Sequence, residues 1–213
     1  VALSRTSDGG PVLLEPRGGQ AHLARLGLAL LHGCSVAGDP KRVVRACRYA
    51  ARLAFVLAPG AQQQITQTLE VWPWSWSHGD APAAAPPALA TRLRMELELL
   101  FDSEPWPEAL HALQSWGALS LLDPALQADP RLVRSLLQAQ RLQLPLLPAL
   151  LAGADQPLEL AARLQLPQQQ QRWLQQMQEL SAWLQANTGE EAWTGWTAAA
   201  WWGALEQQPR GAE

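Results

Sequence analysis

The sequence predicts an all-α protein with a short β-hairpin at its N-terminus. Apolar side chains recur at helical spacing after Gly19, and proline repeatedly stands where a helical pattern begins. The hairpin is indicated by two short runs of strand-forming residues, around Leu3 and Val12, on either side of a turn with Gly9 and Gly10. Because an isolated two-stranded hairpin is marginally stable, we expect this one to be loosely held.

Proline and glycine punctuate the helical pattern and set the predicted boundaries. Predicted first turns contain Pro40, Pro107, Pro130, Pro157 and Pro167, and predicted ends lie at Gly117 and Gly153. The predicted helices span residues 20–32, 40–57, 61–72, 88–101, 107–116, 130–141, 145–152, 157–165, 168–186 and 190–206. Residues 73–87, which are rich in proline and alanine, are predicted to form a loop.

Composition limits the classes of protein to consider. The chain has 213 residues, of which 48% are hydrophobic and 16% charged, so it can build a core and is not globally disordered. Its formal net charge of −3 restricts any nucleic-acid contact to a local basic patch. No apolar run reaches the roughly 20 residues that span a bilayer, and no signal peptide opens the chain. We expect a soluble cytoplasmic protein without a membrane partner.

The cysteines and tryptophans suggest packing more than chemistry. Cys34 and Cys47 fit neither a disulfide framework nor a zinc site, and we expect both to be buried. The four histidines are scattered, without metal-ligand spacing. Among the 11 tryptophans, those of the predicted loop and of the C-terminal end are candidates for exposure, and docking on a neighbouring helix is favoured over stacking on RNA. These residues are Trp72, Trp74, Trp76, Trp193, Trp196, Trp201 and Trp202.

The predicted helix that begins near residue 40 has two distinct faces. Asp39 before Pro40 is typical of a helix start, with the aspartate as the capping residue. Basic residues at spacings of four, three and four form one stripe, and small apolar residues form another on a different face. The basic stripe is Lys41, Arg45, Arg48 and Arg52, and the apolar stripe is Val43, Cys47, Ala50 and Ala54. Such a helix packs one side into a domain and offers the other to phosphate, although a solvated charged face is the alternative.

Asp39 and Arg42 share a face because they are three residues apart. A carboxylate accepts hydrogen bonds and a guanidinium donates them, so the complementary base edge presents an amino group beside a ring nitrogen. Cytosine and adenine have this edge, whereas uracil and guanine oppose acceptor to acceptor and donor to donor. Each mismatched buried group costs about 1–3 kcal/mol, so the pair is able to select a base. The alternative is that Asp39 is only a helix cap.

Three segments match motifs of a known family. In residues 39–55 the chain has Asp39, Arg42, Arg45, Ala46, Arg48, Tyr49, Ala50, Leu53 and Phe55. Upstream, residues 13–23 read Leu-Leu-Glu-Pro-Arg-Gly-Gly-Gln-Ala-His-Leu, and downstream residues 91–97 read Thr-Arg-Leu-Arg-Met-Glu-Leu. In these segments the chain resembles the class II tRNA nucleotidyltransferases and bacterial poly(A) polymerases. It departs from their pattern at Gly38, Glu15 and His22, each of which replaces an acidic family residue.

The resemblance implies a division of the chain and a set of site residues. Residues 1–19 are similar to the end of the nucleotidyltransferase head, residues 20–104 to the neck domain that binds RNA and nucleotide, and residues 105–213 to the body and tail. It implies nucleotide binding by Asp39, Arg42, Arg45 and Arg48 and RNA binding by Lys41 and Arg52. It also implies a supporting role for Arg92 and Glu96, which brace the neck against the basic helix. Tyr49 is able to stack on a base, although core packing is favoured for it.

Enzymes of this family add CMP or AMP to RNA 3′ ends, using Mg²⁺ held by an Asp-x-Asp of the head. No Asp-x-Asp occurs in the chain, so we expect no catalytic residue and no metal ligand in it. We therefore expect this chain to be the C-terminal part of an enzyme whose complete form uses Mg²⁺ with ATP or CTP. Alone, the chain is expected to be inactive and to bind none of these tightly. Its expected partners are tRNA or another RNA 3′ end and a nucleoside triphosphate, and not DNA.

Two other classes of function remain open. The replacements at Gly38, Glu15 and His22 favour a helical module without a head that binds RNA or protein and has no catalytic activity. An orphan scaffold that docks through its tryptophan-rich end accounts only for residues 187–213. The product, whether CCA, CC, A or poly(A), is not set by these motifs.

Overall fold

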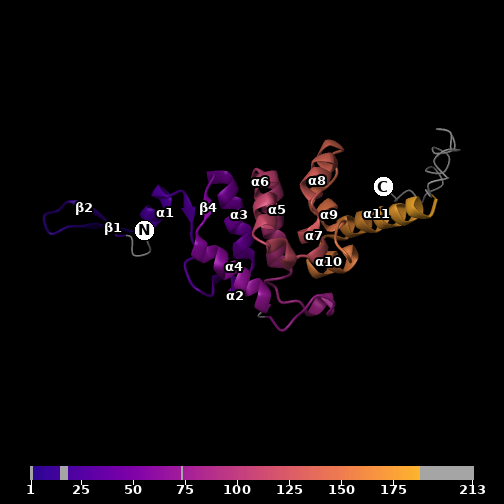
Figure 1. Cartoon of the computed structure of the whole chain (residues 1–213), viewed down its shortest axis with the longest axis horizontal. Coiled ribbons are helices and arrows are strands. Elements are labelled where there is room, and N and C mark those ends of the chain that lie inside the picture. Colours follow the sequence, from indigo (N-terminus) through magenta and orange to yellow (C-terminus); the bar gives the residue numbers. More distant parts are fainter. Residues whose placement is uncertain (1, 15–18, 73, 188–213) are drawn as a thin grey trace.

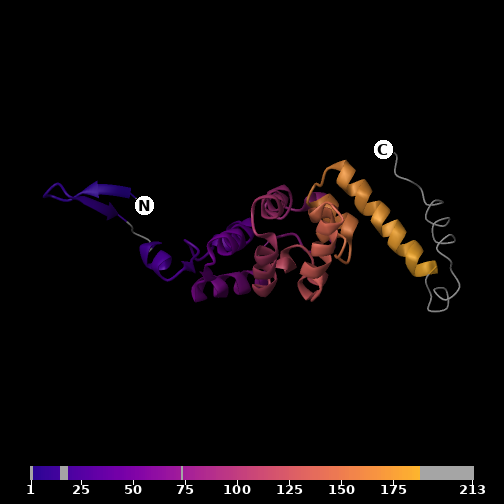
Figure 2. The ribbon, with the colours of Figure 1, turned by 90° about the horizontal axis from the view of Figure 1, so that it is seen from above.

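The computed structural model describes residues 2–14, 19–72 and 74–187. The N-terminal hairpin is present: β1 (Ala2–Arg5) pairs antiparallel with β2 (Pro11–Leu14), and Ala2 lies opposite Leu14. Gly9 has a φ of +83°, which favours glycine, and the amide of Thr6 donates to the carbonyl of Gly10 at 2.9 Å. The hairpin projects away from the helices in both views (Figures 1 and 2). The predicted fold class, all-α with an N-terminal hairpin, is confirmed.

The first helical layer contains five helices and a two-residue strand pair. These are α1 (Gly19–Ala24), β3 (Gly27–Leu28), α2 (Ser35–Gly38), α3 (Lys41–Leu53), β4 (Val56–Leu57), α4 (Pro59–Val71) and α5 (Thr91–Ser103). The parallel pairing of β3 with β4 was not predicted. It follows from two early helix ends, because Leu26 and Ala54 both adopt the left-handed conformation and release the chain into extended structure.

The second layer continues towards the C-terminus with several short helices and one long one. These are α6 (Trp106–Ser115), the 3₁₀ turn η2 (Ala118–Leu121), α7 (Pro124–Ala128), α8 (Leu132–Arg141), α9 (Leu146–Leu151), α10 (Pro157–Arg163) and the long α11 (Gln168–Asn187). In the described part of the predicted loop, residues 74–87, the regular structure is the 3₁₀ turn η1 (Pro82–Ala84). The helix predicted at 190–206, with Trp193, Trp196, Trp201 and Trp202, lies outside the described residues, as does Glu15.

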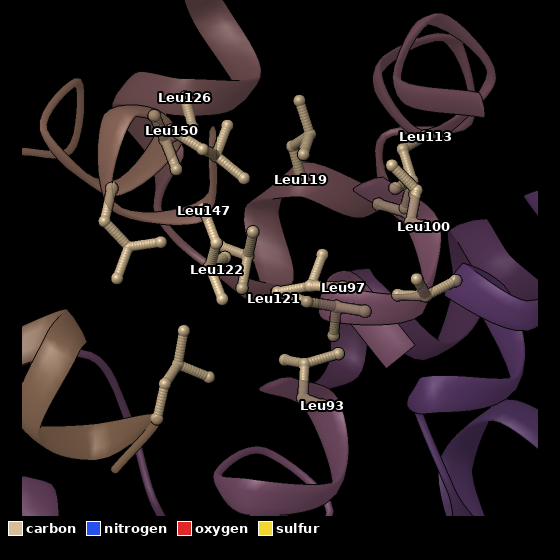
Figure 3. Close-up of a cluster of buried hydrophobic side chains, with 14 of the residues drawn as sticks. Leu93, Leu97, Leu100, Leu113, Leu119, Leu121, Leu122, Leu126, Leu147 and Leu150 are labelled. Atoms are coloured by element: carbon tan, nitrogen blue, oxygen red, sulfur yellow. The ribbon is translucent and has the colours of Figure 1, made fainter. Parts of the chain in front are cut away.

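A single leucine-rich core joins the two layers. Buried apolar residues form one cluster that runs from Val36 in α2 to Leu174 in α11. Figure 3 shows its centre, where leucines of α5, α6, η2, α7 and α9 meet. Helix α3 packs on both α5 and α6, and α8 packs on the same α6. The helices therefore stack side by side along the molecule (Figure 1).

The loop tryptophans dock on neighbouring elements. Trp76 is 5% exposed, and the guanidinium carbon of Arg163 in α10 lies 4.8 Å from its ring centroid. Arg163 also donates to the carbonyls of Leu121 and Leu122, at 3.1 and 2.8 Å, and burial lowers its pKa to about 10. This docking explains why a segment without regular structure is held against the second layer.

Two expectations about burial are wrong. Cys34 is exposed, because it precedes the short helix α2 on the surface, whereas Cys47 is buried as expected. Tyr49 is 41% exposed and does not pack in the core, because it lies on the outer face of α3 beside Arg52. No helix within the described ranges is long and apolar enough to cross a membrane.

Candidate functional site

The junction between α2 and α3 holds Asp39 in an unusual environment. Asp39 closes α2: its backbone is extended, and its amide donates to the carbonyls of Ser35 and Val36. Helix α3 begins after Pro40, and no side chain caps its amides. The prediction that Asp39 caps this helix is therefore wrong, because the capping position falls one residue later. The carboxylate is left free for another role.

The Asp39 carboxylate is largely shielded from water but only partly paired. Its side chain is 15% exposed, and Oδ2 lies 3.6 Å from Nζ of Lys41. Oδ1 is buried and has no hydrogen-bond partner. A buried acceptor without a donor is costly in a folded protein, and such groups occur where a ligand completes the arrangement.

Arg42 lies on the same junction and is oriented by main-chain atoms. Its Nη1 donates to the carbonyl of Ser35 at 3.2 Å. The Ser35 turn is in turn fixed by α4, because Oε1 of Gln64 accepts from the amide of Val36 and Nε2 donates to the carbonyl of His32. The sequence did not reveal these supports, since a main-chain acceptor and a glutamine 22 positions beyond Arg42 leave no local pattern.

The remaining arginines of α3 form an ionic ladder with two acids at α5 and its C-terminal end. The ionic ladder consists of Arg45, Glu96, Arg48, Glu104 and Arg52. Arg45 Nε donates to Glu96 at 3.0 Å, and Arg48 Nη1 donates to the other Glu96 oxygen at 2.7 Å. Arg48 Nε and Arg52 Nε donate to the two oxygens of Glu104 at 3.2 and 2.9 Å. Arg48 therefore lies between two carboxylates.

Burial differs sharply along the ionic ladder. Arg48 and Glu96 are 8% and 3% exposed, whereas the side chains of Arg45 and Arg52 are 47% and 48% exposed. The hydrogen bond that Arg45 donates to Glu96 raises the pKa of Arg45, and the one that Arg52 donates to Glu104 raises the pKa of Arg52. Hydrogen bonds from Arg52, and then the charges of Arg52 and Arg48, lower the pKa of Glu104. All members of the ladder with a resolved shift thus favour their charged forms.

The structure brings some predicted site residues together and separates others. Asp39, Lys41 and Arg42 cluster at the start of α3, and Arg45, Arg48 and Arg52 follow along the same helix. Glu96 faces α3 rather than Arg92, which is exposed and has no ion-pair partner among the described residues. Glu104, absent from the sequence prediction, is the second acid of the ladder. Nowhere in the described ranges do three or more His, Cys, Asp or Glu side chains gather as they would around a metal ion.

The fold of this chain resembles that of solved proteins. The fold matches part of a CCA-adding enzyme solved with ATP (TM-score 0.61, 19% identity, 83% of this chain and 43% of that chain). It also matches a tRNA nucleotidyltransferase solved with a primer tRNA and an ATP analogue (TM-score 0.54, 19% identity, 80% and 51%). The helical fold is therefore one that tRNA-processing enzymes share.

Part of the chain also has a curated sequence relative. A CC-adding tRNA nucleotidyltransferase of Deinococcus radiodurans is 35% identical over 131 residues, which cover 60% of this chain and 31% of the relative. The resemblance to class II tRNA nucleotidyltransferases is thereby confirmed for the shared part. The chain spans about a third of that relative and about half of the solved chains. No family model matches it.

Proposed function

We propose that this chain is the part of a CMP- or AMP-adding nucleotidyltransferase that selects the base and holds the RNA. The observation that carries the proposal is the buried, unpartnered Oδ1 of Asp39 beside the oriented guanidinium of Arg42. The names of the relatives, which include enzymes solved with CTP, ATP and a primer tRNA, support the substrate class. The proposed partners are accordingly an RNA 3′ end and a nucleoside triphosphate.

In the proposed mechanism Asp39 and Arg42 serve as a protein template. The amino group of cytosine or adenine donates to Asp39, and the ring nitrogen accepts from Arg42. Only one Arg42 nitrogen bonds the Ser35 carbonyl, so other N–H groups of its planar fork remain as donors. The Ser35 carbonyl takes the orienting role at a site where the family has a glutamate and this chain has Gly38.

The other predicted residues take graded roles. Arg45 is half exposed and has N–H groups beyond those that meet Glu96, so we assign it the nucleotide phosphates. Arg48, enclosed between Glu96 and Glu104, positions α3 rather than touching a ligand. Lys41 and Arg52 are proposed as RNA contacts, with Arg92 and Glu96 as support. The division into residues 1–19, 20–104 and 105–213 belongs to the same proposal.

In this proposal the described residues do not bind the metal ion. Mg²⁺ stabilises charge during nucleotidyl transfer, and the described residues offer it no carboxylate cluster. We therefore propose that a nucleotidyltransferase head supplies the metal and that this chain alone does not catalyse. The proposed location is the cytoplasm, where tRNA is processed.

The test is a chimera in which this chain replaces the matching part of the Deinococcus radiodurans relative. Its incorporation of CMP, AMP, UMP and GMP into tRNA lacking its 3′ end is measured with Asp39→Ala, Arg42→Ala and neither change. We expect each change to reduce the preference for CMP over UMP by about tenfold or more, which corresponds to about 1–3 kcal/mol per unpaired group. Unaltered nucleotide choice in both variants would refute the template.

The chimera also distinguishes the proposed function from the alternative of a helical module without catalytic activity. The replacement of the family glutamate by Gly38 favours that alternative. A chimera that folds and binds tRNA yet incorporates no nucleotide, while the parent enzyme does, would support the non-catalytic module.

A further inference from the structure

A cavity of about 230 Å³ lies between the loop that follows α4 and the second layer. Its walls are made by residues from three segments, 76–82, 122–124 and 155–163. The turn η1 of the loop packs on α10, which brings the first and third of these segments together. Sites for drug-sized ligands measure about 300–1,000 Å³, so this cavity suits a small metabolite. It shares no wall residue with the start of α3 or with the ionic ladder.

The loop side of the cavity is held in place by side-chain contacts. His78 Nε2 donates to the carbonyl of Ser120 at 3.1 Å, and Trp76 Nε1 donates to the carbonyl of Ala81 at 3.2 Å. The rings of Trp76 and His78 also contact each other, with their centroids 5.6 Å apart. This wall is therefore preorganised, which lowers the free-energy cost of binding a ligand.

A buried cation lines the cavity. Arg163 is 3% exposed, and its Nη2 donates to the carbonyls of Leu121 and Leu122. Its Nη1 is buried and has no hydrogen-bond partner among the described residues. An unpaired charged donor is costly, and a carboxylate is an acceptor whose two oxygens match a guanidinium. Arg163 therefore marks the place of an anionic group of a ligand.

Acidic side chains line the same cavity. Asp155 lies just before α10 and Glu159 in its first turn, and both are exposed. Glu159 and Arg163 are four residues apart on α10, a spacing at which an acid and a base commonly pair, yet no ion pair joins them in the described structure. Asp123, a third acid of the cavity, accepts from the amide of Ala125 at 2.8 Å. The cavity thus has a buried cation and, at its exposed end, acceptors for a second cation.

This combination of charges disfavours simpler ligands. A phosphate or a nucleotide would place its negative charges among three carboxylates, and a simple cation would meet the charge of Arg163. Within the described ranges, no three His, Cys, Asp or Glu side chains are placed to hold a metal ion. A ligand that carries both an ammonium and a carboxylate group matches both ends of the cavity. Leu122 and Leu160, which are 3% and 5% exposed, add an apolar wall.

We propose that this cavity binds a free α-amino acid with an apolar side chain. The carboxylate of the ligand accepts from Arg163, and its ammonium group donates to Glu159 and Asp155. Its side chain contacts Leu122 and Leu160. This binding is independent of base selection at α3, and it links the loop, α7 and α10 through one ligand.

The experiment is isothermal titration calorimetry of the full 213-residue chain with leucine, isoleucine, valine, methionine and phenylalanine. The amino acid that binds most tightly is then compared with its analogue without the amino group and its analogue without the carboxylate, which for leucine are isocaproate and isoamylamine. We expect each analogue to bind at least about tenfold more weakly, because a charged group of the cavity loses its partner. No binding by any of the amino acids, or equal binding by either analogue, would overturn the proposal. Tighter binding of inorganic phosphate or of Mg²⁺ would also overturn it.

A pair of double variants tests whether the amino acid occupies this cavity. Asp155→Asn with Glu159→Gln changes two exposed side chains, so we expect normal folding and an affinity reduced by about tenfold or more. The control, Asp102→Asn with Glu108→Gln, removes the same charge at exposed positions outside the cavity and should bind as the unaltered chain does. Equal affinities in the two double variants would overturn the proposal. Arg163 is left in place, because its guanidinium also holds the carbonyls of Leu121 and Leu122, and the analogue without the carboxylate tests its contact instead.

Discussion

Gly38 shows how a single position bears on the specificity of the proposed template. It occupies the place of a family glutamate, its φ lies outside the left-handed region, and a Cβ built there meets nothing within 4 Å. We expect Gly38→Glu to fold normally and, in the chimera, to raise the preference for CMP over UMP because Arg42 gains a charged acceptor. Gly38→Gln is the neutral control. Equal preferences in Gly38→Glu and the unaltered chimera would show that the Ser35 carbonyl already suffices.

Arg48 is the residue whose loss should destabilise the fold most among the α3 arginines. It serves two carboxylates whose side chains are 4% and 0% exposed. Arg48→Ala leaves both short of a donor, and we expect the free energy of unfolding to fall by about 2–4 kcal/mol. Arg48→Lys should restore only part of this, since one ammonium cannot span both acids. Urea unfolding measures the change. The control is Arg92→Ala at an exposed position, whose free energy of unfolding should stay within about 0.5 kcal/mol of that of the unaltered chain.

Glu104 should make stability sensitive to acid. Hydrogen bonds from the arginines lower its pKa in the folded protein below the ordinary value of 4.5, so the unfolded chain binds a proton first as the pH falls. The stabilisation is fully present above pH 4.5 and is lost as the pH falls through the folded pKa. We expect Glu104→Gln to lower the free energy of unfolding at about pH 6 and to lose most of this difference at about pH 3. Urea unfolding at intervals between these pH values would contradict the assignment if the difference stayed constant.

At the scale of the elements, helix α3 ends in a conformation that its sequence does not favour. Ala54, its C-terminal cap, has φ and ψ of +52° and +39°, a left-handed conformation that costs residues with a Cβ roughly 1 kcal/mol. We therefore expect Ala54→Gly to stabilise the protein by about 0.5–1 kcal/mol in thermal or urea unfolding. The same change at Ala162, an exposed position inside α10, should destabilise by a similar amount. Loss of stability in both variants would mean that the left-handed conformation of Ala54 is not a source of strain.

The elements also show what the sequence can predict. Helices α3, α5, α6 and α11 were anticipated within a few residues, because each has an apolar stripe long enough to show a period. Helices α2 and α7 and the β3–β4 pair were missed, since two to five residues show no period. At the site, the motif located Asp39 and Arg42. The ion-pair partners of the arginines in the basic stripe are Glu96 and Glu104, which lie about 50 residues away along the chain. Pairing over that distance has no local pattern.

At the scale of the whole molecule, the described helices are joined by one core although the molecule is long in Figures 1 and 2. Helix α3 packs on α6, and α5 packs on both α6 and α9, so contacts cross the proposed boundary at residues 104–105 in several places. Figure 3 shows Leu97 and Leu100 of α5 in the same cluster as Leu147 and Leu150 of α9. A boundary in sequence is thus not a boundary in packing.

This continuity predicts that the neck and body unfold together. Urea unfolding followed by far-ultraviolet circular dichroism and by tryptophan fluorescence should give coincident transitions, because a shared core couples the helices on both sides. Val43→Ala in α3 and Leu160→Ala in α10 remove buried side chains at opposite ends of that core. Each should shift both signals to lower urea together, by about 1–3 kcal/mol for the valine and about 2–5 kcal/mol for the leucine. Separate transitions, with each variant moving only one, would instead mean that residues 20–104 and the rest of the described helices are independent domains. The residues proposed to select the base would then lie on a unit that is free to move relative to the rest.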